Sequence, residues 1–87
     1  LQSQYDDPDF YVMQELTEKI EEALARLPEN IREAFELNRF QNLTYNEIAE
    51  RLGVSPKTID YRIQQALKQL RIDLKDYLPV LLSFLLR

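Results

Sequence analysis

Residues 43–71, which read LTYNEIAERLGVSPKTIDYRIQQALKQLR, contain start and stop signals for two helices. Thr44 and Glu47 have the Thr-x-x-Glu spacing of a capping box, in which each side chain accepts a hydrogen bond from the backbone N–H of the other residue. The first helix is therefore predicted to begin at about Tyr45. Gly53 marks its end, because glycine adopts the left-handed conformation of helix termini without steric cost.

A second helix follows at once, since Ser55 is a good N-cap residue and Pro56 suits the first helical position. A connection this short favours a sharp helix-turn-helix bend. Apolar residues at helical spacing indicate the faces on which the two helices bury each other: Ile48 and Leu52, then Ile59, Ile63, Ala66, Leu67 and Leu70.

The opposite face of the second helix is rich in hydrogen-bond donors, as a helix that reads the DNA major groove needs to be. The residues predicted to contact bases are Lys57, Thr58, Tyr61, Arg62 and Gln65. Those predicted to contact phosphates are Thr44, Tyr45, Ser55 and Lys68, two of which stand at helix starts whose free N–H groups attract anions.

The motif LTYNEIAERLGVSPKTI, followed by Arg62, Ala66 and Leu70-Arg71, resembles region 4 of bacterial RNA polymerase sigma factors. Leu27-Pro28 and the stretch 32–35 upstream extend the resemblance, which is to the small extracytoplasmic-function type. It implies recognition of the minus-35 promoter element in double-stranded DNA, core RNA polymerase as a partner, and a membrane-linked anti-sigma factor. Asp60 and Gln65 depart from the pattern, because many relatives have basic residues there; Asp60 could still accept a hydrogen bond from cytosine.

The resemblance also implies a site for the flap-tip helix of the polymerase β subunit. The candidates for this contact are Phe35, Leu37 and Phe40, for each of which core packing is the alternative.

The composition favours one small all-α domain, a bundle of four to five helices. The chain has 87 residues, one glycine, and no cysteine or histidine. Disulfides and thiol chemistry are excluded, and a transition-metal site is disfavoured. No pattern of a catalytic site is present, so we predict no enzyme, no cofactor, no metal and no small-molecule substrate.

The net charge of −4 conceals a strong asymmetry along the chain. Residues 1–30 carry eight acids and two bases, whereas residues 51–75 carry six bases and two acids. Positive charge is thus concentrated on the predicted reading helix, as expected of a DNA-binding protein.

The remaining segments are assigned more simply. Residues 1–8 are predicted to be a linker or frayed end, residues 9–76 the domain, and residues 77–87 an apolar tail. We expect a helix capped by Asp9, with a stripe of Met13, Leu16, Ile20, Ala23 and Leu27, and a second helix at about Glu29–Phe40. The apolar series of the last long helix is expected to continue through Ile72, Leu74 and Leu78.

The tail, YLPVLLSFLL at Tyr77–Leu86, is too short to span a bilayer, which takes ~20 residues. It is expected either to pack onto the domain or to mediate self-association. No signal peptide opens the chain, which predicts a cytoplasmic location, and the initial Leu1 suggests a fragment of a longer protein.

Three functions are compatible with these patterns. The first is the promoter-recognition domain of an alternative sigma factor. The second is the output domain of a LuxR-type regulator, which has a similar helix-turn-helix. The third is a helical protein-interaction module in which the apolar tail binds the partner.

Overall fold

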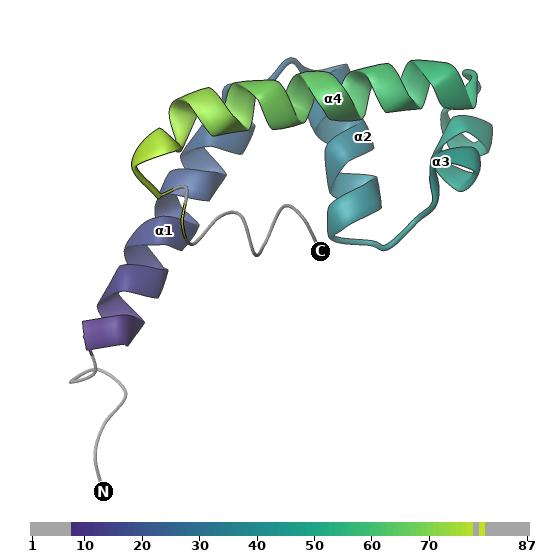
Figure 1. The fold of residues 1–87 in the computed structure, drawn as a ribbon. Coiled ribbons are helices and arrows are strands. Elements are labelled where there is room, and N and C mark those ends of the chain that lie inside the picture. The colour runs from purple at the N-terminus through teal and green to yellow at the C-terminus, as the bar shows by residue number, and fades with distance from the viewer. Residues whose placement is uncertain (1–7, 78, 80–87) are drawn as a thin grey trace, which may run out of the picture.

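The computed structural model describes residues 8–77 and 79. Within these residues the chain forms four α-helices and a 3₁₀ turn, with no β-strand: α1 (Pro8–Ala25), α2 (Glu29–Arg39), α3 (Tyr45–Leu52), α4 (Pro56–Asp73) and η2 (Lys75–Tyr77). Figure 1 shows α4 lying across the other helices. The prediction of a small all-α bundle is confirmed.

The first helix begins earlier than predicted. Because α1 starts at Pro8, Asp9 lies inside the helix and is not its cap. The helix ends at Ala25, and the chain then turns directly into α2, for which Pro28 is the N-cap residue. The carbonyl of Pro28 accepts hydrogen bonds from the N–H groups of Ile31 and Arg32, so the proline orients the start of α2 without a capping side chain.

The turn between α2 and α3 is held by two hydrogen bonds. The N–H of Leu43 donates to the carbonyl of Leu37 at 3.1 Å, and the Asn38 side-chain amide donates to the carbonyl of Leu43 at 2.8 Å. Asn42 takes a positive φ of 58°, which asparagine tolerates better than most residues. These contacts fix the direction in which the chain enters α3.

The helix-turn-helix has the caps predicted from the sequence. The Thr44 N–H donates to Glu47 Oε1 at 2.8 Å, and the Glu47 N–H donates to Thr44 Oγ1 at 3.1 Å. Gly53 is left-handed, with φ 70° and ψ 34°, and its N–H and that of Val54 both donate to the carbonyl of Ala49. Helix α3 is thus capped at both of its ends, and the second cap forms the bend into α4.

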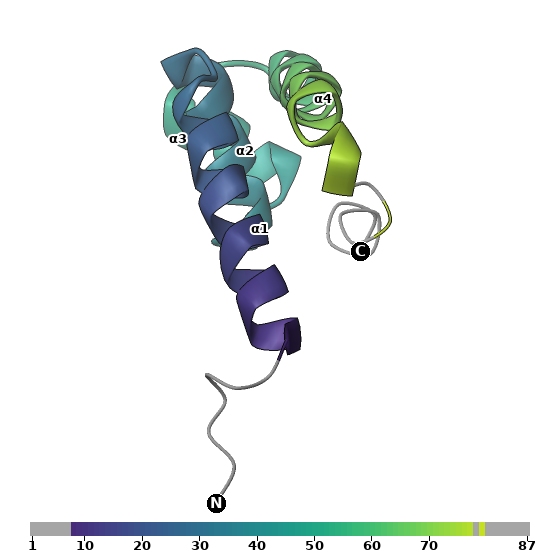
Figure 2. The same cartoon turned by 90° about the vertical axis from the view of Figure 1, so that its left-hand side faces the viewer.

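Helix α4 is the element against which α1, α2 and α3 all pack (Figure 2). Its inward face is entirely apolar, and no polar or charged side chain is buried among the described residues. The buried residues are Leu16, Ala23, Leu24, Leu27, Ala34, Phe35, Leu37, Ile48, Ala49, Ile59, Ile63, Ala66, Leu70 and Leu74.

Two residues assigned to the apolar stripes are on the surface instead. Met13 is 52% exposed, because the N-terminal end of α1 extends past the other helices (Figure 1). Ile72 is 58% exposed, because it lies roughly 160–200° around α4 from the buried Leu70 and Leu74. Leu78 and the rest of the apolar tail fall outside the described residues, apart from Tyr77 and Pro79.

Candidate nucleic-acid interface

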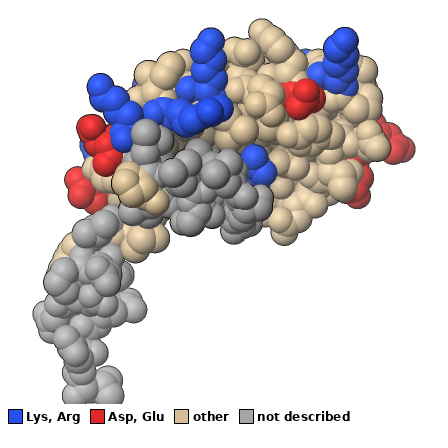
Figure 3. Space-filling model, in the orientation of Figure 1, with Lys and Arg blue, Asp and Glu red and all other residues tan. Residues whose placement is uncertain are grey.

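The outward face of α4 carries a line of exposed polar side chains from its first turn to its fourth. Lys57, Tyr61, Gln64 and Lys68 recur at intervals of three or four residues, which places them on one side of the helix. The Tyr61 side chain is 61% exposed. Figure 3 shows Lys and Arg side chains standing along the edge of the molecule that α4 forms. This face can therefore approach a polyanion without any rearrangement of the core.

Three predicted base contacts lie on the flanks of this line and are half-buried: Thr58, Arg62 and Gln65. The Thr58 hydroxyl lies 3.0 Å from that of Ser55, whose oxygen also accepts the Thr58 N–H at 3.1 Å. Thr58 thereby helps to hold the start of α4 in place. Arg62 and Gln65 are long enough to reach outward from the flank.

The start of α3 already carries a negative charge. Hydrogen bonds from the backbone and side chain of Thr44 hold the pKa of Glu47 below its usual value. The Thr44 hydroxyl is engaged in the same box, and Tyr45 is half-buried against the core. A phosphate at this end of α3 would meet the N–H groups of Tyr45 and Asn46, which as first-turn groups lack intrahelical acceptors.

Arg39, the last residue of α2, was not predicted from the sequence as a site residue. It lines a hollow of about 350 Å³ together with Asn38, Asn42, Leu43 and Thr44, beside the start of α3. Its guanidinium carbon lies 5.9 Å from the centre of the Phe35 ring. Its Nε is buried and has no hydrogen-bond partner among the described residues.

Little in the sequence singles out Arg39, because its position depends on the Phe35 ring beneath it and on the α2–α3 turn. The Arg39 guanidinium and the first-turn N–H groups of α3 both favour an anion in this hollow, whereas the nearby carboxylate of Glu47 opposes one. The hollow and the outward face of α4 are joined through α3, which packs on both α2 and α4.

The three candidates for a polymerase contact are placed differently. Phe35 is 1% exposed and Leu37 is buried, so both belong to the core. Phe40 is 48% exposed and packs edge-on against Phe35, with ring centres 6.2 Å apart and an interplanar angle of 83°. Of the three, only Phe40 presents substantial surface to a partner.

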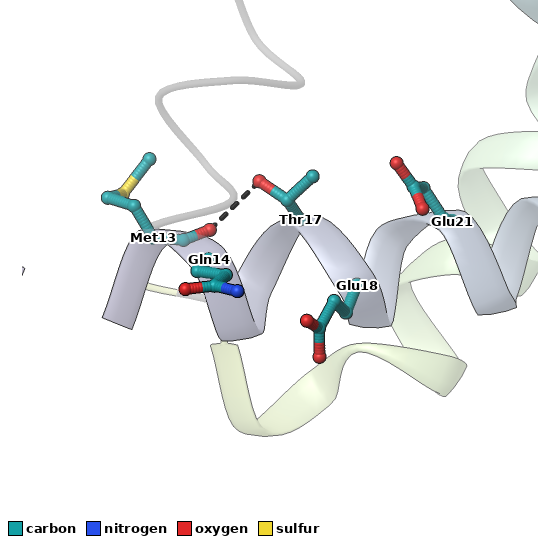
Figure 4. A pocket seen from close by; sticks show the side chains of 5 residues that line it. All are labelled: Met13, Gln14, Thr17, Glu18 and Glu21. Atoms are coloured by element: carbon teal, nitrogen blue, oxygen red, sulfur yellow. Dashed lines mark hydrogen bonds between the residues drawn. The ribbon is translucent and has the colours of Figure 1, made fainter. Parts of the chain in front are cut away.

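A second hollow, of about 340 Å³, lies along α1 and is drawn in Figure 4. It is lined by Met13, Gln14, Thr17, Glu18 and Glu21. The Thr17 hydroxyl donates to the carbonyl of Met13 at 2.8 Å, so it is occupied within the helix. With two carboxylates and no basic residue in this lining, the hollow does not suit a phosphate backbone.

The described part of the chain has neither a cluster of metal-binding side chains nor a helix that could span a membrane. No group of three or more His, Cys, Asp or Glu residues in it could hold a metal ion. None of the helices that the structure describes is both long enough and apolar enough to cross a membrane.

Comparison with known families identifies the family to which this helix-turn-helix belongs. The family model described as Sigma-70, region 4 matches residues 17–70, which include the whole of α2, α3 and the turn into α4. The chain belongs to the Sigma-70 region 4 family. Region 4 is a DNA-binding regulatory domain, so the predictions of a DNA-binding sigma-factor domain and of no enzyme are confirmed.

Individual relatives agree with this family. The chain is 41% identical to the "ECF RNA polymerase sigma factor RpoE" of Cereibacter sphaeroides over 69 residues, which cover 79% of this chain and 38% of that protein. It is 44% identical to the "RNA polymerase sigma factor SigZ" of Bacillus subtilis over 59 residues, covering 64% of this chain and 34% of that protein.

A third relative is the "Positive control factor" of Bacillus subtilis, 37% identical over 60 residues, with 69% of this chain and 36% of that protein covered. The region 4 chain thus spans between 34% and 38% of the length of these relatives. No solved structure matches it.

Proposed function

We propose that this region 4 domain recognises the minus-35 element of promoters as duplex DNA and, within an alternative sigma factor of the extracytoplasmic-function type, directs core RNA polymerase to initiate transcription. The observation that carries the proposal is the division of α4 into an apolar inward face and a donor-rich outward face. The second helix of such a motif enters the major groove and reads base edges with its N-terminal residues.

The base contacts are assigned to the first turns of α4. Lys57 and Arg62 are the donors suited to guanine, and Gln65 is suited to adenine. Tyr61, with most of its ring exposed, can contact a thymine methyl group or a sugar. We assign the phosphate contacts to Lys68, farther along α4, and to the N-terminal ends of α3 and α4, at Thr44, Tyr45 and Ser55.

Arg39 is added to the phosphate contacts. A phosphate oxygen in the hollow between α2 and α3 would approach the guanidinium group of Arg39, which lines that hollow. Binding there would hold α3 against the backbone while α4 lies in the groove.

The proposed partners follow from the same role. Phe40 is the residue we assign to the polymerase contact, and an anti-sigma factor remains a proposed regulator on the strength of the family resemblance. This role would place the protein in the cytoplasm, with the chromosome.

The decisive experiment is promoter-selective transcription by the full-length protein with core RNA polymerase, over a library of promoter sequences. The test variant replaces both Lys57 and Arg62 with Ala. The matched control replaces Lys19 and Lys75 with Ala. These residues lie on α1 and η2, away from the reading face, and their substitution gives the same change in charge.

The proposal predicts that the Lys57 and Arg62 variant loses its preference among minus-35 sequences while the control keeps it. Equal behaviour of the two variants would contradict the assignment of α4. If the protein binds duplex DNA but never engages polymerase, the LuxR-type alternative replaces the sigma role. If the protein neither binds duplex DNA nor engages polymerase, the protein-interaction alternative replaces the sigma role.

Arg39 has a separate test. Arg39→Gln should weaken binding about equally for all sequences and reduce the slope of log affinity against log salt by roughly 1, as expected for loss of one phosphate contact. A changed base preference, with the slope unaltered, would show that Arg39 acts in another way.

A further inference from the structure

Asp60 is the one acidic residue on the outward part of α4 between its first turn and Lys68. It is exposed, follows Lys57 by three residues and precedes Gln64 by four, so it lies one helical turn from each. The other acid of α4, Asp73, is placed quite differently. It lies 3.7 Å from Arg26 in an ion pair and accepts a hydrogen bond from Gln69 at 3.0 Å.

Asp60 has no ion pair with any residue that the structure describes. The carboxylate is therefore available to accept a hydrogen bond when DNA arrives. When α4 approaches a duplex, this carboxylate comes close to phosphates that repel it, and a hydrogen bond from a base would offset that cost.

The major groove offers an acceptor-only side chain very few partners. Guanine presents two acceptors, N7 and O6, and thymine presents the acceptor O4 and a methyl group. Adenine presents a donor, its N6 amino group, but next to the acceptor N7. Cytosine presents the N4 amino donor without an acceptor of its own beside it.

We propose that Asp60 is a specificity-determining residue whose carboxylate selects cytosine at one position of the DNA site, by accepting a hydrogen bond from the N4 amino group. The inference rests on the proposed function, since it requires α4 to lie in the major groove. It assigns to Asp60 both an attraction to cytosine and a repulsion from the acceptors of guanine and thymine, which is an effective way to gain specificity.

Lys57 and Gln64 make this arrangement workable. The ammonium group of Lys57, one turn earlier on α4, offsets the repulsion between the carboxylate and the nearest phosphates. Gln64 and Tyr61 can each donate as well as accept hydrogen bonds. Among these neighbours, Asp60 is therefore the side chain that can only accept.

The test is selection of binding sites from a randomised duplex library by the full-length protein with core RNA polymerase, comparing the wild type with Asp60→Asn and Asp60→Ala. The wild type should prefer cytosine at one position by roughly fivefold or more, the lower end of the discrimination given by specific base contacts. Asn pairs with adenine N6 and N7, so Asp60→Asn should change that preference from cytosine to adenine. Asp60→Ala should lose it without replacement.

Glu33→Gln is the matched control, because Glu33 is exposed on α2 and its substitution gives the same change in charge. It should leave every base preference unchanged. Circular dichroism of each variant verifies that the helices are intact.

The outcomes distinguish a failure of this inference from a failure of the proposed function. If the wild type selects a sequence and Asp60→Asn selects the same one, Asp60 does not determine specificity. If the selected sequence has no preferred cytosine, the inference is also overturned. If the wild type selects no sequence at all, the proposed function is refuted, and this inference with it.

Discussion

Replacing Gly53 with Ala should cost about 1 kcal/mol of stability, through backbone strain alone. Gly53 has φ 70° and ψ 34°, and a Cβ atom built on it would meet no atom within 4 Å. The left-handed conformation costs an L-residue about 1–2 kcal/mol. Alanine also lowers the conformational entropy of the unfolded chain, which stabilises the folded state by about 0.4–1 kcal/mol and offsets part of this cost.

The measurement is thermal unfolding followed by far-ultraviolet circular dichroism. For a domain of this size, 1 kcal/mol corresponds to a fall in Tm of about 4–8 °C. Gly53→Asn serves as the control, because Asn adopts the left-handed conformation more readily than other residues with a side chain. The Tm of this variant should fall less than that of Gly53→Ala.

Either of two results would refute the reasoning. An unchanged Tm for Gly53→Ala would mean that the bend does not depend on the left-handed residue. Equal and large losses for Ala and Asn would mean that the added side chain clashes, in a place where the structure shows open space.

Three further predictions concern single groups. Glu47→Gln keeps a hydrogen bond to the Thr44 amide but removes the charge. Because folding lowers the pKa of Glu47, its charge stabilises the fold above the unfolded-state pKa of 4.5. This stabilisation is lost as the pH falls through the lower pKa of the folded state. Urea unfolding at about pH 7 and about pH 3 should therefore show the gap between wild type and variant closing in acid. Ile63 is fully buried, so Ile63→Ala should cost about 2–5 kcal/mol and Ile63→Val about 0.5–1.5 kcal/mol in the same assay; similar losses would contradict its place in the core. Desolvation, together with a hydrogen bond to Glu15, raises the pKa of Tyr77 above 10.0, so the neutral phenol stabilises the fold below that pH and the contribution is lost as pH rises through the raised value. Tyr77→Phe should flatten the alkaline fall in stability, and parallel curves would argue against the contact.

The helix-turn-helix could be predicted from sequence because its signals are local. A capping box, a left-handed glycine and a serine followed by proline each act over three or four residues, so the order of residues contains the whole interaction. The structure shows all three at the predicted positions. The buried face of α4 was predictable for the same reason, since periodicity is a property of the helix itself.

Features that depend on neighbouring elements were predicted less well. Met13 continues the apolar stripe of α1, but the helices that would cover it end before they reach it (Figure 1). Ile72 is apolar but out of phase with the buried face of α4. The buried Nε of Arg39 lies beside residues of the α2–α3 turn, a tertiary arrangement that spacing along the sequence does not record.

The two faces of α4 have a consequence for how such proteins diverge. Ile59, Ile63, Ala66 and Leu70 meet the rest of the domain, while Lys57, Asp60, Tyr61 and Gln64 do not take part in the core. The outward residues can therefore be exchanged one by one without repacking the bundle. A duplicated gene could acquire a new set of target promoters by substitutions on one side of one helix, and a designer could transfer a promoter preference between relatives by grafting those positions alone.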